Sequence, residues 1–249
     1  MSVVRIAADP HALAREAADL AGSVLREAVT ARGAAHAMFA TGNSQLEFLD
    51  RLVEDPAIPW NSVVGFHMDE YIGISADHTA SFARYMRERI VDRVHPSAFH
   101  LIDGLATPEG ECVRYATLLR EFPLDLCVLG IGENGHLAFN DPPVADFDDP
   151  LDVKVVELDV ACRRQQVGEG HFPSFDAVPT HAITVTIPAL LRAGVVVAIV
   201  PEARKAGPVV AAVEGPVTTA CPASRLQDCV HAVMYLEPAS AARLRSSSR

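Results

Sequence analysis

The sequence predicts an α/β protein: a single three-layer αβα domain built around a mostly parallel, Rossmann-like sheet. Short apolar runs of strand length alternate with amphipathic segments of helix length along most of the chain. Several of these runs are apolar throughout, as expected for strands that are buried on both faces. Polar turns follow the runs at their carboxyl ends, which is where open α/β sheets bind ligands.

The first part of the chain predicts a helix, a strand and a second helix. Asp9-Pro10 combines a capping side chain with a proline in the first turn, and apolar residues then recur at helical spacing up to Gly33, which can end the helix. The apolar run 36–40 predicts a short strand. A helix is expected to begin at Ser44, three residues before a glutamate, because this is the spacing of a capping box.

The remaining elements continue the alternation. Apolar runs predict strands at 62–68, 124–131, 153–158, 182–186, 195–201 and 232–236. Periodic segments predict helices at 79–94, 108–121 and 202–213. The stretch 142–179 is poor in clear periodicity, and we expect it to contain a lid or an insertion over the binding pocket.

Size and composition favour one domain. The chain has 249 residues, of which 49% are hydrophobic, so it can bury a substantial core. We expect the domain to span residues 1–242 and the Ser/Arg-rich end, 243–249, to be disordered. The formal net charge of -11 argues against nucleic-acid binding, which needs a basic face, but allows a small anionic ligand.

Location and assembly are less constrained. No apolar run is long enough to span a membrane, and the N-terminus lacks the features of a signal peptide. The five cysteines are widely spaced and form no zinc-like cluster, which favours free thiols in a reducing compartment. We therefore expect a cytoplasmic protein without membrane contact, either a monomer or a homo-oligomer.

The most informative segment is 129–141, with the sequence LGIGENGHLAFND. It follows an apolar strand and presents His136 on a glycine-containing turn. An imidazole can donate and accept a proton near neutral pH, as sugar ring opening requires. Asp141 could orient this ring and stabilise the imidazolium, or could equally cap the turn before the following prolines. The alternative for His136 is a core histidine satisfied by the backbone.

A second polar pair, Asp69-Glu70, follows the strand predicted at 62–68. A carboxylate at this strand end could act as a general base that moves a proton between neighbouring carbons through an enediol(ate). The alternative is a pair of solvated charges. His67 lies beside the pair, but no second histidine falls at ligand spacing, so we predict no metal site.

Anion-binding groups are expected at three places. A turn between a strand and a helix offers free N–H groups and hydroxyls to a phosphate, although an ordinary capped turn would look the same. Its residues are Thr41, Gly42, Asn43 and Ser44. Arg163, Arg164 and Lys205 are candidate phosphate clamps, the two arginines being open to the alternative of a solvated face. Lys205 is one of only two lysines, with Lys154, in a chain that otherwise uses arginine.

With these motifs, the chain resembles the glucosamine-6-phosphate deaminase (isomerase) family, within the superfamily shared with 6-phosphogluconolactonase. The similarity runs from about residue 8 to residue 236. Its specific parts are Thr41-Gly42, Met68-Asp69-Glu70-Tyr71, the 130–140 run through His136 to Ala138-Phe139-Asn140, and Lys205 ahead of residues 211–215. The 66–71 block and the Ala-Phe-Asn ending are typical of the deaminase branch, not of the lactonase branch.

The resemblance implies conversion of glucosamine 6-phosphate and water to fructose 6-phosphate and ammonia, with no cofactor. His136 matches the acid/base that opens the ring, and Asp69 matches the base that moves the proton between C2 and C1. The substrate contacts implied are Lys205, the 41–44 turn, Gly135 in the glycine run, and either Arg163 or Arg164. Glu70, Asn134 and Asp141 complete the expected catalytic group.

The chain departs from the family pattern at several positions. Asn134 stands where some members carry Asp, and Asp141 stands where Glu is usual, one methylene longer. The 41–44 turn is less glycine-rich, the 162–166 segment differs, and the C-terminal residues of allosteric members have no match, so we predict no such regulation.

Three other hypotheses remain. The first is a lactonase that acts on a phosphorylated sugar lactone, which would need His136 to activate water but would have little need for Asp69. The second is a non-catalytic sugar-phosphate sensor, which Asn134 and Asp141 motivate. A nicotinamide enzyme is weak, because no GxGxxG follows the first strand. The identity of the amino sugar is left open.

Overall fold

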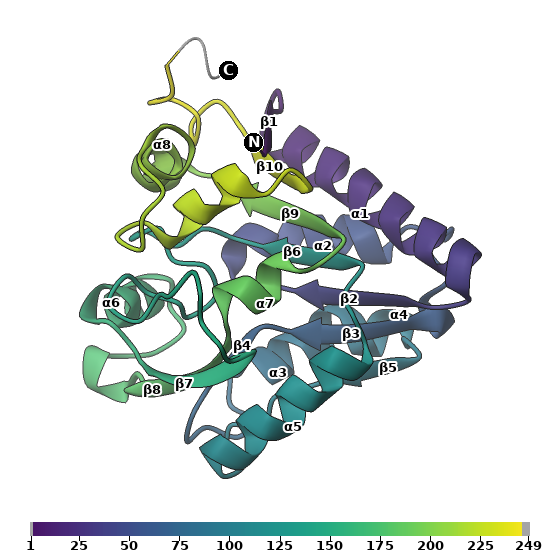
Figure 1. Cartoon of the computed structure of the whole chain (residues 1–249), viewed down its shortest axis with the longest axis horizontal. Helices are drawn as coiled ribbons and strands as arrows, with labels where there is room; N and C mark the ends of the chain where they lie inside the picture. Colours follow the sequence, from purple (N-terminus) through teal and green to yellow (C-terminus); the bar gives the residue numbers. More distant parts are fainter. Residues whose placement is uncertain (1, 246–249) are drawn as a thin grey trace.

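The central feature of the molecule is a seven-stranded sheet in which every pairing is parallel. The computed structural model describes residues 2–245. The strand order is β1-β10-β9-β6-β2-β3-β5 (Figure 1). The bounds of these strands are Val3–Ile6 (β1), Ala232–Leu236 (β10), Val195–Val200 (β9), Leu126–Leu129 (β6), Ala35–Phe39 (β2), Val63–His67 (β3) and Ala98–His100 (β5).

The apolar character of the strands follows from burial on both faces. In β2, Ala37 and Phe39 pack into the core on one side, whereas Met38 and the next residue, Ala40, pack into the core on the other. Because successive side chains in a strand point to opposite faces, a strand covered on both sides must be apolar at every position. This arrangement confirms the predicted three-layer α/β fold.

One helical layer is formed by α1 (Pro10–Arg32) and α2 (Leu46–Val53), together with α3 (Phe82–Met86), a π-helical turn η3 (Arg87–Val91) and α4 (Asp92–Val94). The start of α1 is as the sequence predicts, because the Asp9 carboxylate accepts a hydrogen bond from the N–H of Ala12 at 2.8 Å. Gly33 ends the helix with φ 79°. The second layer is formed by α5 (Pro108–Glu121), α7 (Ile187–Leu191), α8 (Ala206–Glu214) and the 3-10 segment Pro222–Asp228. In Figure 1, α5 and α7 lie in front of the sheet and α2 lies behind it.

A second, three-stranded antiparallel sheet was not predicted. It contains β4 (Asp69–Tyr71), β8 (His181–Val185) and β7 (Val153–Glu157) in the order β4-β8-β7. The run predicted as one strand at 62–68 leaves the main sheet at Met68, whose carbonyl accepts a hydrogen bond from Val185. Two other predicted strands, 153–158 and 182–186, therefore belong to this small sheet. Figure 1 shows it beyond the carboxyl end of β3.

Several local predictions were wrong. Ser44 makes no capping box, because residues 43–45 form a 3-10 turn ahead of α2 and the glutamate three residues later contacts His11. The helix predicted at 79–94 begins at Phe82, where Ser81 caps the N–H of Arg84. Elements missed by the sequence reading are β1, β5, α7 and α6 (Val160–Gly168).

The C-terminal prediction also needs revision. Leu244 is buried in the core and the N–H of Arg245 donates to Glu214, so the tail expected at 243–249 does not begin at 243. Residues 246–249 lie outside the described part of the chain. All five cysteines are free thiols, and Cys112 is the most exposed of them. Across residues 2–245, the structure contains no helix whose length and apolar character would let it cross a membrane.

Candidate active site

A cavity lies at the carboxyl ends of four neighbouring strands, β9, β6, β2 and β3. From β2 the chain continues outward through β3 to β5, whereas from β6 it continues the other way through β9 to β10. Ligands of open α/β sheets bind at such a switch point. The side chains and turns that follow these strands line the cavity: Thr41 to Ser44, Met68 and Asp69, Gly130 to Gly132, His136, Arg204 and Lys205.

His136 is placed by the tight turn after β6. A Cβ at Gly132 would lie 2.2 Å from the His136 ring, so only glycine fits beneath it. The Nδ1 atom of His136 lies 2.9 Å from the Asp141 carboxylate, so Nε2 is the ring nitrogen that remains for a ligand. Asn134 supports both groups, because its amide donates to Asp141 at 2.8 Å and its oxygen accepts from the His136 N–H at 3.1 Å.

The Asp141 carboxylate is held in its ionised form. Its side chain is fully buried, which alone would raise its pKa, but the contacts with His136 and Asn134 outweigh burial and lower the pKa. The arrangement therefore places a negative charge behind the imidazole. Asn134 is the donor that fixes the orientation of this charge.

Asp69 and Glu70 separate into different environments. Asp69 lines the cavity, is 5% exposed, and its Oδ1 has no hydrogen-bond partner within residues 2–245. Burial raises the pKa of Asp69 well above its ordinary value, and the charges of Glu70 and Asp141 raise it further. Glu70 turns away, accepting hydrogen bonds from the Ser81 hydroxyl at 2.7 Å and the Ala83 N–H at 2.8 Å. Asp69 is thus the carboxylate open to a ligand, and Glu70 caps α3.

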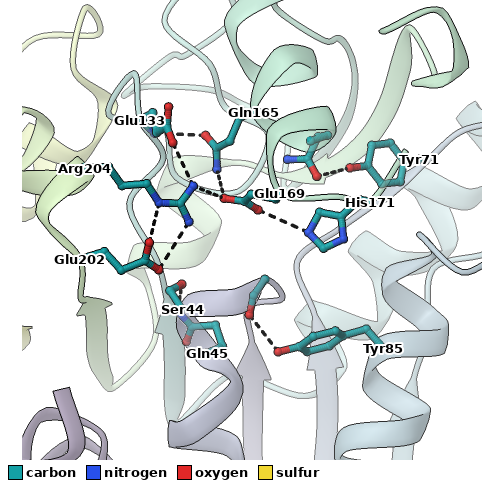
Figure 2. Close-up of polar contacts among 12 residues, drawn as sticks. Ser44, Gln45, Tyr71, Tyr85, Glu133, Gln165, Glu169, His171, Glu202 and Arg204 are labelled. Carbon is teal, nitrogen blue, oxygen red and sulfur yellow. Dashed lines mark hydrogen bonds and ion pairs between the residues drawn. The ribbon is translucent and has the colours of Figure 1, made fainter. Parts of the chain in front are cut away.

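The turn after β2 offers backbone groups to the cavity. Gly42 has φ 103°, a conformation that favours glycine, and its carbonyl accepts a hydrogen bond from the Tyr85 hydroxyl at 3.0 Å (Figure 2). Ser44 contacts Gln45, whose amide donates to its hydroxyl at 3.0 Å. Tyr85 therefore ties the turn to α3.

The two lysines differ in position, because one lies away from the cavity and the other lines it. Lys154 donates to the Asp149 carboxylate at 2.8 Å and to the Val144 carbonyl at 2.6 Å, away from the cavity. Lys205 lines the cavity and is 4% exposed. Burial, followed by the charge of Arg204, lowers the pKa of Lys205. Among the described residues Lys205 enters no salt bridge, so its ammonium is available to an anion.

Three residues expected to contact substrate do not line the cavity. The Arg163 guanidinium donates to the Phe175 and Val178 carbonyls, both at 2.9 Å, and stacks on the Phe175 ring. Arg164 lines a separate hollow beside α6. Gly135 has φ 83° and packs against Cys221, where a Cβ would lie 2.7 Å from its sulfur. The two arginines are therefore structural and surface residues.

One wall of the cavity was missed by the sequence reading. It comes from α6 and the residues after it, within the stretch expected to be a lid or an insertion: Gln165, Gln166, Glu169 and His171. The Tyr71 hydroxyl donates to Gln166 at 2.7 Å, which anchors α6 to the small sheet (Figure 2). Arg204 was also missed, although it directly precedes Lys205 at the end of β9. No periodic pattern marks these positions.

Side chains of metal-ligating type occur at His67 and in one cluster that includes His136. His67 is buried, its Nε2 accepts from the Ile102 N–H at 2.8 Å, and burial lowers its pKa to about 3. Within residues 2–245, the single group with metal-ligand composition is His136, Asp141 and Cys162. Burial raises the pKa of the Cys162 thiol well above its usual value, and Asp141 raises it further, which disfavours the thiolate that a metal requires. That the site uses no metal stays a prediction.

Comparisons with known proteins agree with this geometry. The family model described as glucosamine-6-phosphate isomerases/6-phosphogluconolactonase matches residues 8–235. A glucosamine-6-phosphate deaminase of an Exiguobacterium species is 32% identical over 94% of this chain and 90% of its own length. A protein of the same name from Streptococcus pyogenes serotype M3 is 31% identical over 92% of this chain and 95% of its own length.

Solved structures of proteins with these names are also similar to this chain. The structure of a monomeric glucosamine-6-phosphate deaminase superposes with a TM-score of 0.89 at 27% identity, covering 98% of this chain and 100% of the other. A 6-phosphogluconolactonase from Shewanella baltica has a TM-score of 0.80 at 23% identity over 95% of this chain and 98% of the other, which shows a shared fold. The chain belongs to the glucosamine-6-phosphate isomerase/6-phosphogluconolactonase family.

Proposed function

We propose that the chain is a glucosamine-6-phosphate deaminase, which converts glucosamine 6-phosphate and water to fructose 6-phosphate and ammonia. The observation that carries the proposal is a buried carboxylate of raised pKa, Asp69, in the same cavity as His136 and Lys205. The names of relatives more than 30% identical over most of the chain support it. Because its five cysteines are free thiols, it is proposed to work in the cytoplasm.

The phosphate group binds at the β2 and β9 ends of the cavity. Lys205 supplies a compact positive charge, and the 41–44 turn supplies N–H and hydroxyl donors. This contact fixes the distance from the phosphorus to the sugar carbons. The sugar then lies across the carboxyl ends of β6 and β3, between His136 and Asp69.

Ring opening is assigned to His136. The imidazole accepts the proton of the O1 hydroxyl and returns a proton to the ring oxygen O5 as the C1–O5 bond breaks. Asp141 stabilises the imidazolium that forms in between, because its carboxylate lies 2.9 Å from Nδ1. Asn134 keeps this carboxylate in place.

Isomerisation is assigned to Asp69. Its carboxylate removes the proton from C2, which gives an enediol-type intermediate with nitrogen on C2, and the resulting carboxylic acid protonates C1. Water then adds to the C2 imine and ammonia leaves. A raised pKa makes Asp69 a stronger base than an ordinary aspartate, and desolvation keeps competing water away. Glu70 is proposed to act only through the charge it exerts on Asp69 and through the capping of α3.

The test is a parallel assay with three substrates: glucosamine 6-phosphate, galactosamine 6-phosphate and 6-phosphogluconolactone. Ammonia release from glucosamine 6-phosphate is expected. Lactone hydrolysis without ammonia from either amino sugar would contradict the proposal and indicate the lactonase reaction, which has no need of a C2 base. Ligand-induced thermal stabilisation without any turnover would indicate a sugar-phosphate sensor.

A further inference from the structure

Arg204 stands at the edge of the cavity in a cluster of carboxylates. Its Nη1 atom lies 3.0 Å from Glu133 and 2.9 Å from Glu169, and its Nε donates to Glu202 at 2.6 Å. These partners come from three separate segments: the turn after β6, the end of α6 and the turn after β9. Figure 2 shows the guanidinium between them, with Glu169 on the side of His171.

The Glu169 carboxylate contacts hydrogen-bond donors and positive charge, as a bound anion would. Its side chain is 9% exposed, and its carboxylate accepts a hydrogen bond from the Gln165 amide at 3.0 Å and lies 3.4 Å from His171 Nε2. Burial opposes ionisation, but the contacts with His171 and Gln165, followed by the charges of Arg204 and Lys205, lower the pKa of Glu169 to about 2. The carboxylate is therefore charged at any working pH.

This arrangement conflicts with a phosphate in the same cavity. Glu169, Arg204 and Lys205 all line it, so a phosphate held by Lys205 would approach the Glu169 carboxylate. Two anions close together in a partly desolvated site repel each other, and both are attracted by the same guanidinium. Arg-phosphate pairs are charge-assisted and bidentate, so the phosphate is a strong competitor for this cation.

We infer that Arg204 is the second cation of the phosphate subsite and that Glu169 occupies its place until the phosphate displaces it. The inference rests on the proposed function for the identity of the ligand. Phosphate binding then costs the Glu169–Arg204 contact, which links the end of α6 to the turn after β9. Because Tyr71 holds Gln166 in the same helix, the displacement is confined to the residues that follow it. Glu169 thus selects for ligands with enough charge to displace it.

The test is calorimetric titration of inorganic phosphate into the wild-type protein, three single variants and one double variant. Glu169→Gln keeps the shape of the side chain and removes the competing charge, so phosphate should bind at least about tenfold more tightly. Glu133→Gln is the matched control, because this carboxylate contacts the same Nη1 atom but is 46% exposed, and its effect should stay within about twofold. Glu169→Ala should behave as Glu169→Gln does.

Two results would overturn the inference. One is phosphate binding to both Glu169 variants that is no tighter than to the wild-type protein, including no binding to any of them. The other concerns Arg204: in the Glu169→Gln background, Arg204→Gln should weaken phosphate binding by about tenfold or more, and an unchanged affinity would exclude the guanidinium as a ligand. Inorganic phosphate is not turned over, so these results are independent of whether the chain releases ammonia.

Discussion

Replacing Asp69 by asparagine should stabilise the fold while it abolishes the proposed chemistry. The Asp69 carboxylate is buried with an unpartnered oxygen, and its raised pKa means that the folded chain holds the proton more tightly than the unfolded chain does. Ionisation of Asp69 therefore destabilises the native state. An unsatisfied buried polar group costs about 1–3 kcal/mol, and we expect Asp69→Asn to gain about 2 kcal/mol at pH 8.

The sign of the pH dependence follows from the direction of the shift. Below the unfolded pKa both states are protonated and the variant gains little. As the pH rises through the folded pKa, the wild-type protein loses stability that the variant keeps, so the difference grows and then becomes constant. For a chain of this size, about 2 kcal/mol corresponds to a rise in Tm of roughly 4–8 °C.

The assay is urea and thermal unfolding from about pH 3 to pH 8, a range that includes the ordinary pKa of an aspartate, with Asp152→Asn as the matched control. Asp152 is also buried, but its ion pairs with Arg120 and Arg192 outweigh burial and lower its pKa. The stability that the Asp152 carboxylate contributes is present at pH values above the ordinary pKa of an aspartate and is lost as the pH falls. The Asp152→Asn variant should therefore be less stable than the wild-type protein at pH 8 and approach its stability in acid. An Asp69→Asn variant that is less stable than the wild-type protein at pH 8 would refute the reasoning.

Four further variants test the site. Glu70→Gln removes a charge that raises the pKa of Asp69, so the acidic limb of the pH profile of kcat/KM should move to lower pH. Asp141→Asn should lower kcat by about 100-fold or more with a small change in KM, in steady-state kinetics, because the imidazolium loses its counter-charge. Lys205→Gln should raise KM for the phosphorylated sugar at least about tenfold, whereas Arg163→Gln should lower Tm and leave KM within about twofold, because Arg163 bonds backbone carbonyls outside the cavity.

The five inner strands of the main sheet, from β10 to β3, could be predicted because each is marked by its own apolar run, whereas the two edge strands, β1 and β5, were missed. A strand covered on both faces must be apolar at every position, as Val195–Val200 is. Such an apolar run can be recognised in the sequence without knowing which strand it pairs with. The capped start of α1 is also a local signal, since Asp9 is the N-cap and Pro10 is the first residue of the helix. The four cavity turns followed from these strands, because parallel strands place their carboxyl ends at one edge.

The small sheet could not be predicted in the same way. Asp69–Tyr71 is only three residues long and pairs with a strand more than one hundred positions later, so its partner is set by tertiary packing. The same holds for Glu70, whose role as the cap of α3 depends on where that helix begins. In the sequence, Asp69 and Glu70 are two adjacent acidic residues with nothing to distinguish them. In the structure they are neighbours in a strand, where successive side chains point to opposite faces.

The arginine proposed to bind the phosphate, Arg204, could not be predicted from the sequence either. Arg163 and Arg164 form a conspicuous pair, but a helix directs the one onto backbone carbonyls and the other to the surface. Arg204 carries no periodic signal and reaches the cavity only because β9 ends there. Glu169 is brought opposite it by α6, which the sequence left without a clear pattern.

The most direct test of the central claim is ammonia release from glucosamine 6-phosphate by the wild-type protein and by Asp69→Asn, at a pH where both are folded. The account predicts ammonia release by the wild-type protein, with the proton that Asp69 takes from C2 delivered to C1 of the fructose 6-phosphate. It predicts at least about a 100-fold lower rate for the variant, because a neutral amide cannot take the C2 proton. Ammonia release by Asp69→Asn at the wild-type rate would contradict the account.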